Sequence, residues 1–265
     1  LDLAEKIKTF LTTGLGEGNW RILRENNGAV EYDAPGLSGK EHIYLSIEPV
    51  ADAAKDHYYF ALRGSIAFIE GIPIYGQPSV VTAYTPLVNA PMNYWISANG
   101  QRAIIVVRVA SVYMLMYLGK FLPYATPSQY PYPVIVSGMT LTKNYRYSSN
   151  ELSHIMRPIY HCGYLYLPNN ISLIIKSYNG REFTMPSTAY RNFEKPVNND
   201  NPLLIPAVMI NNITKDTFGE LDGLFWISGF GVKSEDILID NGKKYLVFQN
   251  AYRVDFNNFC AMEWQ

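Results

Sequence analysis

Histidine, cysteine and carboxylate side chains are the groups that most often bind metals or carry catalysis, and this chain has few in suggestive arrangements. It contains four histidines and two cysteines. The closest potential metal set is His154, His161 and Cys162. A spacing of seven residues between these histidines matches no standard zinc arrangement, and no second cysteine lies nearby. The sequence therefore predicts hydrogen-bonded structural histidines, with no metal site and no cofactor.

Short motifs give no catalytic site either. The sequence has no Gly-x-Ser-x-Gly elbow and no phosphate-binding loop ending in Lys-Ser or Lys-Thr. Gly14, Gly16 and Gly18 resemble a dinucleotide-binding turn, but they follow a predicted helix, whereas that motif precedes one. Asp52 and Asp56 lie in a polar, loop-like stretch, and nothing marks either as the protonated acid that glycoside hydrolysis needs. We therefore expect a protein that is not an enzyme.

The composition favours a protein that is covered by partners. Charged residues make up 17% of the chain, below the roughly 25% typical of soluble domains. Aromatic residues make up 14%, including 21 tyrosines, and tyrosine is enriched at interfaces. The alternative reading is that β-proteins use tyrosine in their strands. Few charges and many aromatic groups together predict a surface that is buried against other subunits.

Charge and hydropathy also exclude some partners. The net charge of −1 provides no basic excess for a phosphate backbone, which argues against direct nucleic-acid contact. The longest near-apolar run, from Val109 to Gly119, is too short for a bilayer span and is bounded by charged residues, so we expect no membrane association. No signal peptide is visible, and the two cysteines are expected to be buried thiols in a reducing compartment.

The expected elements are mostly strands. Residues 1–18 should form a helix followed by a Gly-rich turn, because apolar residues recur at helical spacing up to Leu11. Short extended runs separated by turn residues follow, and four Asn-Gly pairs predict hairpins. We predict a mainly β fold: a β-sandwich or barrel-like core with an N-terminal helix and long Pro/Tyr-rich loops. Residues 19–145 form one β-rich region and 146–265 a second, which the sequence does not separate from the first as a domain.

The middle of the chain is the best candidate for contact with other subunits. Asn99-Gly100 predicts a hairpin, and the apolar strand after it, Ala103–Val109, should be covered on both faces. The segment Phe121–Pro133 then holds four prolines, four aromatic residues and no charge. Such a rigid loop loses little conformational entropy on docking, although it could equally pack on its own domain. The residues predicted at an interface are Phe121, Tyr124, Tyr130, Tyr132, Trp95 and Arg102.

Part of the sequence resembles a known group of proteins. The resemblance covers residues 60–140 and the end of the chain, on the stretches Gly76-Gln77-Pro78, Asn93–Arg102, Val106–Tyr113, Tyr117-Leu118-Gly119, Leu122–Pro127, Tyr130–Pro133 and Tyr245–Arg253. These stretches are similar to virion structural proteins of contractile-tailed bacteriophages. The resemblance implies a subunit of a symmetric ring in the head–tail neck or collar, or in the tail. It also implies other virion proteins as partners (portal or connector, tail tube or sheath) and assembly in the host cytoplasm.

Two other functions stay open. One is a baseplate component of the same particle. The other is a glycan-binding, receptor-recognising module, for which Trp20, Trp95, Trp226 and Trp264 would offer stacking surfaces. Large aromatic residues are mostly buried, so core packing is the competing interpretation for these tryptophans.

Overall fold

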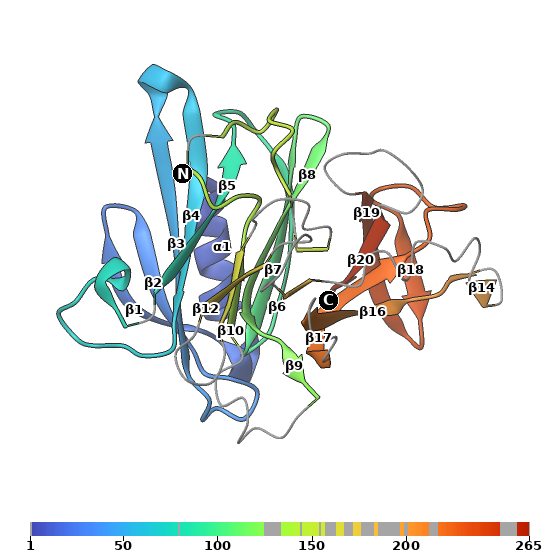
Figure 1. The fold of residues 1–265 in the computed structure, drawn as a ribbon, viewed down its shortest axis with the longest axis horizontal. Helices are drawn as coiled ribbons and strands as arrows, with labels where there is room; N and C mark the ends of the chain where they lie inside the picture. Colours follow the sequence, from blue (N-terminus) through green and yellow to red (C-terminus); the bar gives the residue numbers. More distant parts are fainter. Residues whose placement is uncertain are drawn as a thin grey trace.

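The protein is mainly β, as predicted. The computed structural model describes residues 2–78, 80–124, 134–143, 145–153, 155–156, 163–166, 172–175, 183–184, 197–198, 201–211, 217–249 and 259–264. Within these residues there is one α-helix, at the N-terminus, and most of the remaining regular structure is antiparallel sheet (Figure 1). No helix in this part of the chain is both long and apolar enough to cross a membrane.

The first sheet has five strands in chain order. It is preceded by the helix α1 (Asp2–Thr13) and the short 3-10 turn η1 (Gly16–Gly18). Its strands are β1 (Arg21–Asn26), β2 (Ala29–Ala34), β3 (Ile43–Asp52), β4 (His57–Ser65) and β5 (Val81–Leu87), with the 3-10 turns η2 (Ala53–Lys55) and η3 (Ile74–Gly76) between them. Every neighbouring pair is antiparallel, so the sheet is a simple meander.

The second sheet contains thirteen strands, and its path runs β18-β19-β20-β17-β16-β13-β12-β11-β10-β8-β7-β6. Its N-terminal strands are β6 (Asn93–Ala98), β7 (Arg102–Val109), β8 (Val112–Lys120), β9 (Leu122–Pro123) and β10 (Val134–Ser137). Those that follow are β11 (Gly163–Tyr166), β12 (Ser172–Ile175), β13 (Phe183–Thr184), β16 (Ile205–Asn211), β17 (Thr217–Ile227), β18 (Ile237–Asp240), β19 (Lys243–Gln249) and β20 (Phe259–Trp264). The pair β14 (Val197–Asn198) and β15 (Asn201–Pro202) stands apart, and β9 pairs with β17 off the main path. Both predicted β-rich regions contribute strands to this one sheet.

Strands β7, β8 and β10 form a wall between two hydrophobic cores. Along β7 the side chains alternate: Ala103, Ile105 and Val107 pack in one core, and Ile104 and Val106 pack in the other. The first core is closed by the five-stranded sheet and α1, and the second by strands β16, β17, β19 and β20. Figure 1 shows these layers, with α1 between the first sheet and the wall and the C-terminal strands on the opposite side. The predicted burial of β7 on both faces is therefore confirmed.

Two of the predicted Asn-Gly hairpin turns have the backbone conformation that the dipeptide favours. Asn27-Gly28 joins β1 to β2 with φ angles of 50° and 85°, and Asn241-Gly242 joins β18 to β19 with 48° and 78°. Both residues of each pair are left-handed, as in a type I′ turn. Asn99-Gly100 also links two paired strands, but neither of its φ angles is positive, so this turn is of another kind.

Other local predictions were wrong. The apolar segment Ile72–Tyr75 predicts an extended run, but the 3-10 turn η3 begins at Ile74 and occupies its second half. Strand β5 was not predicted at all. Asn179-Gly180 lies outside the described residues, and the strands on either side of it, β12 and β13, pair in parallel at Ile175 and Phe183. A tight hairpin joins antiparallel strands only, so the predicted hairpin is corrected.

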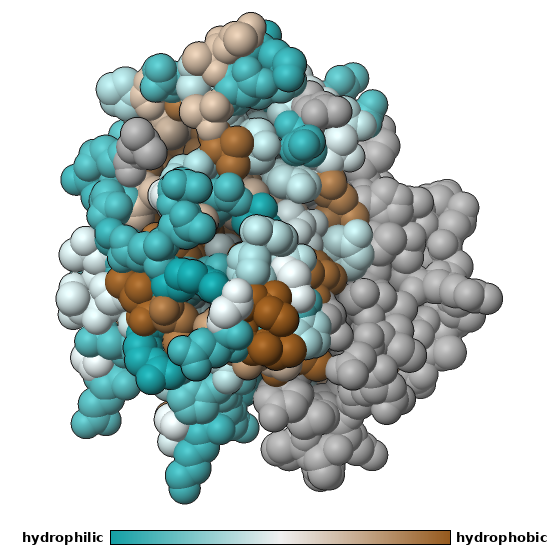
Figure 2. Space-filling view, turned by 90° about the vertical axis from the view of Figure 1, so that its left-hand side faces the viewer, coloured by the Kyte–Doolittle hydropathy of each residue, from teal (hydrophilic) through white to brown (hydrophobic). Residues whose placement is uncertain are grey.

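The outer side of the five-stranded sheet exposes hydrophobic residues in separate patches among hydrophilic ones (Figure 2). The most exposed large apolar residues between β4 and β5 are Ile69 and Tyr75, at 46% and 71%. Scattered apolar residues of this kind are normal on a protein surface. The edges of the sheets carry the more distinctive surface features.

Candidate interaction site at the edge of the large sheet

Among the described strands, β6 has a partner on one side of its backbone only. It is the last strand of the large sheet and pairs with β7 alone among the described strands. The Asn99 amide donates to the Arg102 carbonyl at 3.0 Å, so Asn99 is a position that is hydrogen-bonded to the neighbouring strand. Hydrogen-bonded positions alternate along an antiparallel pair. Tyr94 and Ile96 lie an odd number of residues before Asn99. They are therefore at the other type of position and direct their N–H and C=O groups away from β7.

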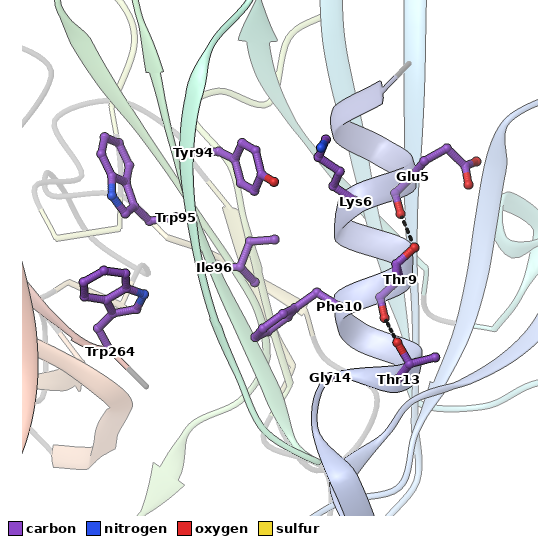
Figure 3. A pocket seen from close by; sticks show the side chains of 10 residues that line it. All are labelled: Glu5, Lys6, Thr9, Phe10, Thr13, Gly14, Tyr94, Trp95, Ile96 and Trp264. Atoms are coloured by element: carbon purple, nitrogen blue, oxygen red, sulfur yellow. Dashed lines mark hydrogen bonds between the residues drawn. The ribbon is translucent and has the colours of Figure 1, made fainter.

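A groove of about 590 Å³ runs along this open edge. Helix α1 forms one side of it, and Trp264 at the end of β20 forms the other (Figure 3). Tyr94 and Ile96 point toward the helix and Phe10, whereas Trp95 points toward Trp264. All five of these side chains are partly exposed. The groove thus combines unpaired main-chain groups with an apolar, largely aromatic lining.

Charged groups are confined to the helix side of the groove, where they are paired. Lys6 lies 3.9 Å from Asp2, and Lys8 donates to Glu5 at 2.7 Å and to Glu25 at 3.4 Å. The hydrogen bond to Glu5 is the main cause of a raised pKa at Lys8. Because the charges are balanced and the lining is apolar, the groove suits an uncharged, extended segment better than an anion or a cation.

Four of the six residues predicted at an interface keep that prediction, and two of the four lie in the described part of the chain. Trp95 forms part of the groove. The Tyr124 side chain is 54% exposed, and its hydroxyl donates to Glu220 Oε2 at 3.1 Å. Tyr130 and Tyr132 lie outside the described residues. A contact of these four residues with another subunit stays a prediction.

The other two residues, Phe121 and Arg102, are internal, which corrects their expected position at a surface. Phe121 is 1% exposed and packs in the second core. Arg102 is 2% exposed, and its guanidinium donates to Ser97 Oγ at 2.8 Å. Tertiary packing places both side chains inside the chain, where they cannot contact a neighbouring subunit.

Asp222, on β17, organises a polar network around Arg102. Its Oδ2 atom accepts hydrogen bonds from Asn99 Nδ2 at 2.8 Å, Gln101 Nε2 at 3.1 Å and Arg102 Nε at 3.3 Å. The Asp222 amide donates to the Tyr117 hydroxyl at 3.1 Å. Burial raises the pKa of Tyr117, and the nearby Asp222 charge adds to the effect. The network ties the β6–β7 turn to β17, and so holds the second core against the wall.

The candidate metal-binding side chains do not come together in the described residues. No group of three or more His, Cys, Asp or Glu side chains in the described part of the chain is placed to hold a metal ion. His154, His161 and Cys162 lie outside it. His42 Nδ1 lies 2.6 Å from Asp33 Oδ1, but the other oxygen of Asp33 accepts from Arg21 Nη2 at 2.9 Å. Both carboxylate oxygens are thus engaged in an ion-pair cluster on the five-stranded sheet.

Comparison with known proteins adds no relative. No protein-family model matches the sequence, and no curated protein sequence matches it.

Sequence reasoning identified Trp95 but missed the rest of the groove. Phe10, Tyr94 and Ile96 were not singled out, and Trp264 was considered only as one of four tryptophans. A hydrophobic pattern predicts that a strand exists, but it does not show which strand ends a sheet. Asp222 was missed because no local motif marks it: its partners lie more than a hundred residues away.

Proposed function

We propose that this chain is a structural subunit of a contractile-tailed bacteriophage virion, in the head–tail neck or collar or in the tail, and that it assembles as a homo-oligomeric ring. The observation that carries the proposal is the open edge of β6 beside its apolar groove. An unpaired strand edge is a template for pairing with another chain. The low charged fraction of the sequence supports the same function. The resemblance of residues 60–140 described above is the reason for proposing a virion as the assembly.

The sequence of β6 strengthens this argument. Proteins that remain monomeric protect their edge strands with lysines, prolines or bulges. The β6 segment Asn93–Ala98 contains no charged residue and no proline. It pairs with β7 through six consecutive residues without a bulge. This edge is therefore suited to accept another strand, and the partners we propose are further copies and neighbouring virion proteins, namely portal or connector, tail tube or sheath subunits.

Labelling of purified particles tests the proposal. An epitope tag after Gln265, detected by gold-conjugated antibody in electron micrographs, should label one axial level of the virion. A label at the neck or along the tail supports the proposed position, whereas a label at the far end of the tail indicates the baseplate alternative. Purified infectious particles that contain no copies of the chain by mass spectrometry would refute the virion function.

The aromatic lining also favours a second candidate, a glycan-binding module. Trp20 and Trp226 are buried, at 2% and 7% exposure, so neither is available as a stacking surface. Trp95 and Trp264 are partly exposed and face the groove, where a sugar ring could stack. This candidate predicts saturable binding to host polysaccharide that Trp264→Ala abolishes. Wild-type protein without such binding removes the candidate.

A further inference from the structure

The opposite end of the large sheet carries a second open edge, at β18. This strand pairs with β19 alone among the described strands. Asp240 and Lys243 flank the two-residue turn and form the first hydrogen-bonded pair of the hairpin. By alternation, Ile237 and Ile239 direct their N–H and C=O groups away from β19.

The side chains at these two outward positions are unusually exposed for isoleucine. Ile237 is 48% exposed and Ile239 is 62% exposed. They are two residues apart on one strand, so they project on the same face of the sheet. Protected edge strands often carry charged residues at such positions. The β18 edge instead presents two exposed isoleucines beside its outward-facing backbone groups.

The two edges of the sheet are complementary. The β6 edge offers two outward-facing residues, Tyr94 and Ile96, beside an apolar groove that no described strand occupies. The β18 edge offers two outward-facing residues with the same spacing, and its isoleucines have no apolar surface that covers them fully. The β18 edge therefore has apolar side chains to be covered, and the β6 edge has an apolar groove that can cover them. Both edges belong to the same chain.

We propose that β18 of one copy adds as an antiparallel strand to β6 of the next copy, inside the groove between α1 and Trp264. Ile237 then lies opposite Ile96, and Ile239 lies opposite Tyr94. Both pairs are of the hydrogen-bonded type, so they form four backbone hydrogen bonds in total. The biological meaning of this contact rests on the proposed ring assembly, and the contact deepens that proposal by naming the surfaces that meet.

Side-chain directions agree with this pairing. Residues directly opposite each other in an antiparallel pair project on the same face. Tyr94 and Ile96 face α1, so Ile237 and Ile239 of the added strand also face α1 and pack near Phe10. The contact buries the two exposed isoleucines and satisfies backbone groups of both edges.

The contact is head-to-tail, because two different surfaces of the chain meet. Repetition of a head-to-tail contact produces a closed ring when the rotation closes, and an open filament when it does not. A sheet that continues from copy to copy would also leave no edge exposed in a closed ring. This is the kind of contact that a ring-forming virion subunit needs.

Disulfide trapping across the contact tests the pairing directly. Opposite residues of a hydrogen-bonded antiparallel pair have Cα atoms about 5.5 Å apart, within the range that a disulfide spans. Two single variants, Ile96→Cys and Ile237→Cys, are purified separately, mixed and oxidised. The mixture should form a cross-linked dimer containing one chain of each kind. Each variant alone is the control for the native cysteines and should not form this dimer. A mixture that cross-links no more than the separate variants overturns the pairing.

Sedimentation velocity tests the same contact without cysteines. Wild-type protein should associate as its concentration rises, and Ile237→Lys and Ile239→Lys should each raise the apparent dissociation constant by about tenfold or more. Ile69→Lys is the matched control, because Ile69 is 46% exposed but lies in the segment between β4 and η3, outside β6 and β18. It should associate as wild type does. Wild-type protein that stays monomeric, or edge variants that associate as strongly as Ile69→Lys, would overturn the inference.

These results are separable from the test of the virion function. Particles that contain the chain, combined with a failed cross-link, refute the β18–β6 contact alone. A successful cross-link, combined with particles that lack the chain, refutes the virion function and leaves the contact in place.

Discussion

Replacement of Asp222 by asparagine should strongly destabilise the protein, because it removes the charge that pairs with a buried guanidinium. The Arg102 side chain is 2% exposed and Asp222 is 17% exposed, so water cannot replace the lost partner. One carboxylate oxygen accepts three hydrogen bonds, from Asn99, Gln101 and Arg102. Breaking a buried ion pair on one side costs about 3–5 kcal/mol. Asparagine keeps one acceptor oxygen, so we expect a loss near the lower limit, about 3 kcal/mol.

The chain offers a matched control for this substitution. Asp56 also pairs with an arginine, Arg146, but the two side chains are 61% and 52% exposed. Asp56→Asn should therefore cost no more than about 1 kcal/mol. Asn also tolerates the left-handed backbone of Asp56, which has a φ of 52°.

Chemical and thermal unfolding measure the difference. The free energy of unfolding is obtained from urea titrations followed by circular dichroism. For a chain of this size, a loss of about 3 kcal/mol lowers the melting temperature by roughly 6–12 °C. If Asp222→Asn and Asp56→Asn lower the stability by the same amount, burial does not control the strength of the Arg102 pair, and the reasoning is refuted.

Three further predictions concern other buried groups. Gly119→Ala should lower the free energy of unfolding by at least about 2 kcal/mol, because a Cβ there would lie 2.3–2.8 Å from atoms of Gln101 and Arg102, at the start of β7. Gly39 also has a positive φ but would have no atom within 4 Å of its Cβ, so Gly39→Ala should cost only about 1 kcal/mol in the same urea titrations. Burial raises the pKa of both Tyr32 and Tyr117 above 10.0, so these tyrosines ionise first in the unfolded chain and stability should fall as the pH rises above that value. The Tyr32→Phe and Tyr117→Phe variants should lose less stability with rising pH in unfolding curves. An unchanged dependence of stability on pH in these variants would contradict tyrosine burial as the cause. Cys260 is buried with a raised pKa, so a maleimide should modify it only after unfolding, as measured by peptide mass spectrometry; rapid labelling of the native protein would show that the thiol is accessible.

Local sequence patterns predicted the elements whose structure depends on local physics. The apolar stripe through Leu11 predicted α1, and Asn27-Gly28 and Asn241-Gly242 predicted two hairpins. The apolar run Ala103–Val109 predicted a strand covered on both faces, because a strand with one solvent-exposed face would alternate apolar and polar residues. These features follow from backbone preference and hydrophobic period, which act over a few residues.

The candidate site depended on contacts between distant parts of the chain. Trp264 reaches the groove from the last described strand, while Phe10 reaches it from the first helix. Arg102 was predicted at an interface, but Asp222 and Ser97 hold it in the interior. No pattern in the neighbouring sequence distinguishes these outcomes, since an arginine next to a hairpin turn is equally compatible with either.

By itself, then, the sequence determined a mainly β protein with an N-terminal helix, few charges and a strand buried on both sides. The tertiary structure alone decided which strands end the large sheet, and so which backbone groups stay unpaired. Strand order is set by packing between residues far apart in the chain, whereas strand formation is set by neighbours. For that reason the chemistry of β6 and β18 was visible in the sequence, but their positions as the two open edges of one sheet were not.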